Sequence, residues 1–205
     1  FECSICSSVG SNNPSGGSVM CENSNCEFKF CNFSNNFIKS NGNDNDSDGG
    51  ALTIRETTGS IIDCFFVNNS VYSDFGNNFG GAFYIGESDV KISNVCFDSN
   101  SILSNYKSAY SQGGAMHIQN TSSIYLISCN FTNNFIKSPE GSSVGNGGAI
   151  HMISSNGDFD LCSFVNNSSL YANRTHGGAI YMSNVVSQIR ETCFINNLII
   201  SLQNE

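Results

Sequence analysis

The strongest constraint on this chain is an internal repeat built from two short sequence words. The first word is Gly-Gly-Ala, which occurs five times and is preceded by one Gly-Gly-Ser copy. Successive copies are separated by 30 to 34 residues. A fixed period of this size is typical of solenoids, in which each repeat buries its apolar face only by stacking on its neighbours. The copies begin at Gly16, Gly49, Gly80, Gly113, Gly147 and Gly177.

The second word is Phe-x-x-Asn, and a cysteine precedes each Phe by one or two positions. The distance from the second Gly to the Phe is 16 residues in five copies and 17 in the other, whereas the distance from the Asn to the next Gly-Gly varies from 10 to 13. We therefore expect a rigid first interval and a length-tolerant loop in the second. The pairs are Phe33/Asn36, Phe66/Asn69, Phe97/Asn100, Phe131/Asn134, Phe164/Asn167 and Phe194/Asn197. The cysteines are Cys31, Cys64, Cys96, Cys129, Cys162 and Cys193.

The residues around both words alternate with the period of a β-strand. Apolar, variable and apolar residues follow Gly-Gly-Ala, as in 52–54, and a second strand is expected to carry Ile62, Cys64 and Phe66. A unit with two or three short strands cannot close its own core. The sequence thus predicts an all-β fold, a single-stranded parallel β-helix of about six coils. Residues 1–30 are expected to form an irregular partial coil, and residues 31–205 the repeat array.

Each word has a predicted structural role in such a coil. At least one of the two glycines is expected to need a positive φ or a close backbone approach. The Phe residues are expected to stack inside the solenoid as one column. The Asn residues are expected either to form a hydrogen-bonded ladder along the axis or to serve only their own turns.

Composition excludes several classes of function. The net charge of −9 argues against a nucleic-acid partner and against docking to anionic lipid. No apolar run is long enough for a membrane span. The chain begins at Phe1 without a signal-peptide pattern, so we expect a processed chain or a segment of a longer one.

The variable position after each Gly-Gly-Ala forms a column that is expected to face solvent. Its members are Thr53, Tyr84, His117, His151 and Tyr181. They are either ordinary exposed strand residues or a ligand strip that stacks on sugars, and the two histidines alone make a weak metal site. No carboxylate pair of the kind used in sugar hydrolysis recurs. We therefore predict no catalytic residues and no enzymatic activity.

An acidic loop precedes the second Gly-Gly word. Asp44, Asp46 and Asp48 alternate and are followed by Gly49, which resembles the first half of a calcium loop. Arg55 stands where such a loop needs a bidentate Glu. The loop is either a Ca²⁺ site, with no other cofactor expected, or a solvated acidic segment.

The ten cysteines fall into two groups. The six that accompany Phe are expected to form a buried column of thiols, except that Cys96 and Cys193 are adjacent to Phe and either point outward or require a bulge. Four others lie outside the column and are candidates for disulfides in an oxidising compartment, with a zinc site as the alternative. These four are Cys3, Cys6, Cys21 and Cys26.

Eight Asn-x-Ser/Thr sequons are candidate N-glycosylation sites. They are Asn32, Asn45, Asn68, Asn120, Asn130, Asn166, Asn167 and Asn173. Asn32 and Asn130 lie between an inward Cys and an inward Phe. These two should therefore face solvent and be good acceptors.

The Gly-Gly-Ala and Phe-x-x-Asn words resemble the repeats of the polymorphic outer-membrane protein (Pmp) family over residues 16–197. The resemblance implies a right-handed β-helix of the pectin-lyase-like superfamily and a surface-displayed segment that adheres to cells or matrix. It carries over no catalytic residues. The family's membrane barrel has no counterpart in these residues, whereas the Asn-rich composition is more similar to surface proteins of single-celled eukaryotes.

These features together predict an extracellular or cell-surface protein with a structural or adhesive role. No capping helix is visible, and open strand edges invite pairing. The ends are therefore expected to meet further coils or neighbouring subunits in a fibre. A glycan-binding module and a polysaccharide-active β-helix enzyme are the competing classes, with cell-surface or matrix glycans as the partners.

Overall fold

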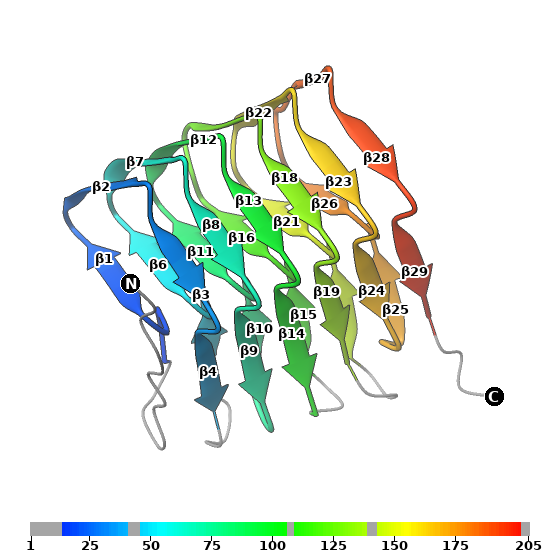
Figure 1. Cartoon of the computed structure of the whole chain (residues 1–205). Helices are drawn as coiled ribbons and strands as arrows, with labels where there is room; N and C mark the ends of the chain where they lie inside the picture. Colours follow the sequence, from blue (N-terminus) through cyan, green and yellow to red (C-terminus); the bar gives the residue numbers. More distant parts are fainter. Residues whose placement is uncertain (1–13, 41–45, 106–108, 139–142, 202–205) are drawn as a thin grey trace.

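The computed structural model describes residues 14–40, 46–105, 109–138 and 143–201, and these ranges contain strands but no helix (Figure 1). Each turn of the chain uses five strands in a fixed order. In the second turn they are β6 (Leu52–Arg55), β7 (Thr58–Ile62), β8 (Phe65–Val67), β9 (Ser70–Ser73) and β10 (Asn78–Phe79). The described strands make five complete turns and a sixth of four strands. The predicted β-solenoid is therefore confirmed.

The other turns repeat the same order. The first contains β1 (Val19–Glu22), β2 (Asn25–Lys29), β3 (Asn32–Ser34), β4 (Phe37–Ser40) and β5 (Ser47–Asp48). The third contains β11 (Phe83–Gly86), β12 (Asp89–Ser93), β13 (Cys96–Asp98), β14 (Ser101–Ser104) and β15 (Tyr110–Gln112). The fourth contains β16 (Met116–Gln119), β17 (Ile124–Ile127), β18 (Asn130–Thr132), β19 (Phe135–Lys137) and β20 (Val144–Asn146). The fifth contains β21 (Ile150–Ile153), β22 (Gly157–Asp160), β23 (Ser163–Val165), β24 (Ser168–Leu170) and β25 (Arg174–His176). The sixth contains β26 (Ile180–Ser183), β27 (Ile189–Arg190), β28 (Cys193–Ile195) and β29 (Leu198–Ile200).

Equivalent strands of successive turns pair in parallel and form five sheets, and in Figure 1 each turn lies beside the one before it. We number the sheets by their first strands: sheet I begins with β1, sheet II with β2, sheet III with β3, sheet IV with β4 and sheet V with β5. The register places like residues over like. Phe83, for example, pairs with Leu52 on one side and Met116 on the other.

Sheets I, II and III enclose the main hydrophobic core. Their inward residues include the Phe column, whose members Phe66, Phe97, Phe131 and Phe164 are fully buried. A second, smaller cluster lies along sheet IV and consists of Ile38, Val71, Ile102 and Ile136. The interval between each Asn and the next Gly-Gly, which we expected to be a loop, therefore contains the strands of sheets IV and V.

Single residues in the left-handed conformation make three corners of every turn. Their φ values lie between 45° and 58°, a region that Asn tolerates better than most residues. The corner between sheets II and III explains one error of the sequence analysis. The predicted strand through Ile62, Cys64 and Phe66 is broken at Asp63, where φ is 54° and the chain turns from β7 to β8.

The Asn ladder is confirmed at the corner between sheets III and IV. Asn69 Oδ1 accepts hydrogen bonds from Asn36 N at 3.0 Å and Asn36 Nδ2 at 2.9 Å. Asn69 Nδ2 donates to Asn100 Oδ1 at 3.0 Å and to Phe33 O at 2.8 Å. The pattern continues to Asn197. Each Asn therefore satisfies buried polar groups of two neighbouring turns.

At the other two left-handed corners, a side chain of the next turn also accepts a hydrogen bond from a backbone N–H, but the side chains differ. Between sheets I and II, Thr57 N donates to Ser88 Oγ at 3.0 Å. Between sheets II and III, Cys31 N lies 3.4 Å from Cys64 Sγ, and Cys162 N donates to Thr192 Oγ1 at 3.2 Å. The thiol column is therefore more than apolar filling, because its sulfur atoms accept backbone hydrogen bonds from the previous turn.

Cys96 and Cys193 leave this column, as their spacing predicted. Cys96 pairs with Asn130 in register, and Val95 occupies the buried position that the cysteines take elsewhere. Phe97 still pairs with Phe131, so the strand has no bulge. Cys193 pairs with Ser163 and is exposed. Both side chains point outward.

The glycine pair lies where the chain passes from sheet V to sheet I. Gly113 has a φ of +75°. A Cβ at Gly114 would lie 2.1 Å from Gly148 O and 2.8 Å from the backbone of Phe135. The first glycine thus supplies the left-handed conformation and the second permits the close approach, in agreement with the sequence prediction.

Regular stacking begins before residue 31. β1 and β2 lie inside the segment expected to be irregular, and they pair in parallel with β6 and β7. The described ranges contain no helix long and apolar enough to cross a membrane.

Candidate functional site

The column predicted as a solvent-facing strip lies on the outer face of sheet I but is buried. Tyr84 is 4% exposed, His117 0% and His151 1%, and Tyr181 in the last turn is half-buried. The residues just before each Gly-Gly cover them from sheet V. The Phe79 ring centroid, for example, lies 4.8 Å from that of His117. The expectation of an exposed strip is therefore wrong, because sheet V was not foreseen.

The buried side chains stack on one another instead of offering a face to a sugar. Ring centroids are 5.4 Å apart from Tyr84 to His117, 4.8 Å from His117 to His151 and 5.3 Å from His151 to Tyr181. The Arg55 guanidinium lies 5.1 Å from the Tyr84 centroid and continues the stack. Burial lowers the pKa of His117 to about 4 and that of His151 to about 2, so both imidazoles are neutral at pH 7.

A hydrogen-bonded chain joins the two histidines to Tyr84. His151 Nδ1 lies 3.1 Å from His117 Nδ1, His117 Nε2 lies 3.1 Å from Gln119 Oε1, and Gln119 Nε2 donates to Tyr84 Oη at 2.6 Å. Since the amide oxygen only accepts, His117 must carry its proton on Nε2 and His151 must donate from Nδ1. Tyr84 Oη therefore accepts a hydrogen bond from Gln119, and the Tyr84 hydroxyl proton does not take part in this hydrogen-bonded series.

A polar pocket opens at the Tyr84 end of this stack. Its volume is about 410 Å³. Its floor is formed by the last position of the sheet I strands, where Glu22, Arg55, Gly86 and Gln119 follow one another in register. Gly86 is the member without a side chain, and Tyr84 lies beside it. The pocket is therefore a local feature of one turn, and Gly86 was the sequence signal that could have revealed it.

Opposite charges meet in the pocket, with an excess of carboxylates. Asp48 is 3% exposed and forms an ion pair with Arg55 through Oδ2. Burial raises the pKa of Asp48 to about 6, although Arg55 opposes the shift, and burial raises the pKa of Tyr84 to about 12. Five carboxyl groups and one guanidinium line the cavity. The carboxyl groups belong to Glu22, Asp46, Asp48, Glu56 and Glu87.

The structure describes only part of the acidic loop that was considered as a calcium site. Asp44 lies outside the described residues. Asp46 Oδ1 accepts a hydrogen bond from Asn77 Nδ2 at 3.0 Å, and the Asp48 carboxylate is engaged with Arg55. The described ranges contain no group of three or more His, Cys, Asp or Glu side chains that could hold a metal ion.

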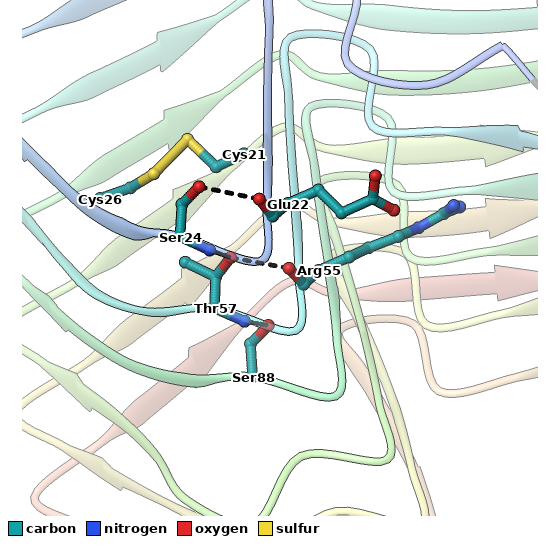
Figure 2. Close-up of a disulfide and its surroundings, with 7 residues drawn as sticks. All are labelled: Cys21, Glu22, Ser24, Cys26, Arg55, Thr57 and Ser88. Carbon is teal, nitrogen blue, oxygen red and sulfur yellow. Dashed lines mark hydrogen bonds between the residues drawn. A yellow bond between two sulfur atoms is a disulfide. The ribbon is translucent and has the colours of Figure 1, made fainter.

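Cys21 and Cys26 form a disulfide across the first corner between sheets I and II (Figure 2). Their Cα atoms are 6.8 Å apart. The bond removes both residues from the alternative zinc set, and Cys3 and Cys6 lie outside the described residues. The six cysteines that accompany Phe are free thiols.

Six of the candidate glycosylation sites lie on the surface. The exposed asparagines are Asn32, Asn68, Asn120, Asn130, Asn166 and Asn173. Asn167 is fully buried, and its Nδ2 donates to Phe131 O at 2.9 Å within the ladder, so the folded protein has no room for a glycan there. Asn45 lies outside the described residues.

Comparison with known proteins assigns no relative to the chain. No family model, no curated protein and no solved structure matches it. The function is therefore argued from the stacked columns and from the pocket.

Proposed function

We propose that the protein is an extracellular or cell-surface β-solenoid with a structural and adhesive role and no enzymatic activity. The observation that carries this proposal is the use of polar and aromatic side chains between turns. Asn134, for example, hydrogen-bonds to Asn100, Asn167 and Phe97 O, and His117 stacks between Tyr84 and His151. Asn and His side chains, which are often catalytic in other folds, here form hydrogen bonds and ring contacts between successive turns. Such contacts would make the solenoid a stiff rod.

Two features support passage through an oxidising secretory route. The Cys21–Cys26 disulfide is the kind of bond that persists outside the cytosol. The exposed sequons at Asn32 and Asn130 stand on the outer face of sheet III, where a glycan would extend into solvent. The Pmp-like words add support for display on a surface, and for the right-handed coil of that family.

Association at the C-terminal face of the stack belongs to the same proposal. In the sixth turn Phe194 is 48% exposed, whereas Phe164 in the fifth turn is fully buried. Leu198 and Ile199 of the sixth turn are also exposed. A further turn bearing the same words, from a continuation of the solenoid or from a neighbouring subunit, would cover them.

Secretion and adhesion can be tested with one preparation. The chain is expressed through a eukaryotic secretory pathway and its peptides are mapped by mass spectrometry. We expect glycans on Asn32 and Asn130, an unmodified Asn167 and a linked Cys21–Cys26 pair. Beads coated with the protein should adhere to cultured cells more than beads coated with the same protein after heat unfolding. Equal adhesion of both bead types, or reduced cysteines and bare sequons in protein purified from its natural source, would contradict the proposal.

A further inference from the structure

The pocket beside Tyr84 has features that the stacking of turns does not require. From its geometry and charge we infer that it is a binding site for a neutral or amino saccharide. Such a site would give the solenoid a recognition function in addition to its structural role. The inference stands on the composition of the pocket wall, on the placement of the Tyr84 hydroxyl over Gly86 and on the charge balance.

The pocket wall offers both hydrogen-bond donors and acceptors. The Tyr84 hydroxyl is almost fully buried, accepts from Gln119 Nε2 and has its proton left to donate. The Asp48 carboxyl is hydrogen-bonded to Arg55 and Ser15, and its buried Oδ1 atom has no partner. Arg55 pairs with Asp48 and also hydrogen-bonds to the Tyr84 hydroxyl, which leaves its remaining N–H groups for a ligand. Adjacent sugar hydroxyls, each of which both donates and accepts, match such a mixed surface, and a buried polar group without a partner costs about 1–3 kcal/mol until a ligand supplies one.

A single glycine lets the Tyr84 side chain lie across the pocket floor. In the neighbouring turns Arg55 and Gln119 occupy the position that Gly86 holds, and Gly86 presents no side chain there. A Cβ at this position would lie 3.0 Å from Tyr84 Oη. The Tyr84 hydroxyl therefore lies over Gly86 and forms this part of the pocket wall, where a longer side chain would displace it. Phe79 forms part of the same wall and offers an apolar ring to the C–H face of a sugar.

The charge of the pocket narrows the ligand class. Five carboxyl groups surround one guanidinium, and Glu22 extends to the same side as Arg55 (Figure 2). Uronic, sialylated and sulfated sugars would be repelled by this excess of negative charge. A protonated simple amine offers only donors and would accept neither from the remaining Arg55 N–H groups nor from the Tyr84 hydroxyl. A neutral sugar satisfies both kinds of group, and a protonated amino sugar also gains from the carboxylates.

Binding of three matched probes tests the inference. The secreted protein is titrated calorimetrically with tetrasaccharides of N-acetylglucosamine, glucosamine and galacturonic acid, and it is applied to an array of neutral glycans. We expect at least one neutral or amino saccharide to bind and the galacturonate tetrasaccharide not to bind. Tyr84→Phe, which removes only the hydroxyl, should weaken binding at least tenfold. Gly86→Gln, which places the side chain of the next turn at this position, should abolish it.

Matched controls separate binding from folding. Tyr110→Phe removes an exposed tyrosine hydroxyl on sheet V and should leave the affinity unchanged. Circular dichroism should show the same thermal midpoint for Tyr84→Phe and Tyr110→Phe within a few degrees, so that Tyr84→Phe remains informative if Gly86→Gln does not fold. Absence of binding to every saccharide, preferential binding of galacturonate, or equal affinity of wild type and Tyr84→Phe would overturn the inference. The adhesion and mass-mapping results expected for the structural role would not change.

Discussion

Phe97 and Phe131 lie face to face on successive turns, with ring centroids 4.7 Å apart and ring planes 2° from parallel. Both are fully buried, and their strands β13 and β18 pair in register at these residues. The contact joins the spacing of the sequence words directly to the fold, because a nearly constant interval from Gly-Gly to Phe brings each ring over the one before it. The one extra residue before Phe131 lies between Gln119 and Ile124, where the register shifts by one residue.

Removal of one ring from this column should be costly. Phe131→Ala is expected to reduce the free energy of unfolding by about 3–5 kcal/mol, since it loses buried area and leaves a cavity between two rings. Phe65→Ala is the matched control, because Phe65 is 54% exposed on the same sheet. The control should change stability by less than about 1 kcal/mol. Urea unfolding measures both, and equal losses would show that the column is not the core.

The Asn ladder predicts an effect far larger than that of an ordinary surface amide. Asn134 accepts from Asn100 N and Nδ2, and it donates to Phe97 O and Asn167 Oδ1. Asn134→Ala leaves buried partners unsatisfied and should cost about 3–5 kcal/mol in urea unfolding. Asn130→Ala, at an exposed strand position, should cost less than about 1 kcal/mol. A small effect of Asn134→Ala would mean that the amides serve only their own turns.

The buried histidines predict that the protein loses stability in mild acid. The pKa of His117 is about 4 in the folded protein and about 6.5 in an unfolded chain, so the unfolded state binds more protons between these values. Stability is therefore present above pH 6.5 and lost as the pH falls. At pH 5 the loss from His117 is about 2 kcal/mol. His151, with a pKa of about 2, acts in the same direction.

Asp48 opposes this trend and calls for a control. Its pKa is raised to about 6, so it favours the folded state at low pH and loses that contribution as the pH rises through 6. The double variant His117→Gln/His151→Gln removes only the histidine contribution. Its unfolding free energy should fall less between pH 7 and pH 5 than that of the wild type, even if it is less stable at both. Parallel pH profiles would show that the two imidazoles do not control the acid response.

Two glycines on neighbouring turns should respond differently to the same change. Gly114→Ala places a Cβ against the backbone of Gly148 and Phe135, which cannot move aside, and should prevent folding or lower the melting temperature by more than about 10 °C. Gly86→Ala meets only the Tyr84 side chain and should be tolerated within a few degrees. Thermal melts compare the two directly. Equal tolerance would contradict the tight junction between sheets V and I.

The stacked core was predictable from sequence because its residues recur at a constant interval. Phe, Asn and Gly-Gly each have one role in every turn, so six copies of the same pattern indicate the role of each position. Sheets IV and V were missed since their interval varies in length, and polar side chains such as Ser73 and Ser111 conceal their strands. Because sheet V was not predicted, the burial of His117 beneath it was not predicted either. The corner at Asp63 was missed because Ile62, Cys64 and Phe66 alternate in the sequence like one strand, whereas in the structure the left-handed residue shifts the phase and Ile61, not Ile62, lies in the core with Cys64 and Phe66.

The pocket could not be foreseen for a different reason. It depends on Asp48 from sheet V, on Arg55 from sheet I and on the Tyr84 side chain that lies over Gly86, and the repeat brings these residues together only after both sheets are in place. Its one sequence signal is the absence of a side chain at position 86.

A crystal structure of the secreted protein tests the central claim, that each block of 30 to 34 residues is one turn with like side chains stacked on like. The account predicts six rings in a single file, Phe33, Phe66, Phe97, Phe131, Phe164 and Phe194, with adjacent centroids 4.7–5.0 Å apart. Electron density that places these rings in separate parts of the molecule, or that shows antiparallel pairing between the blocks, would contradict it.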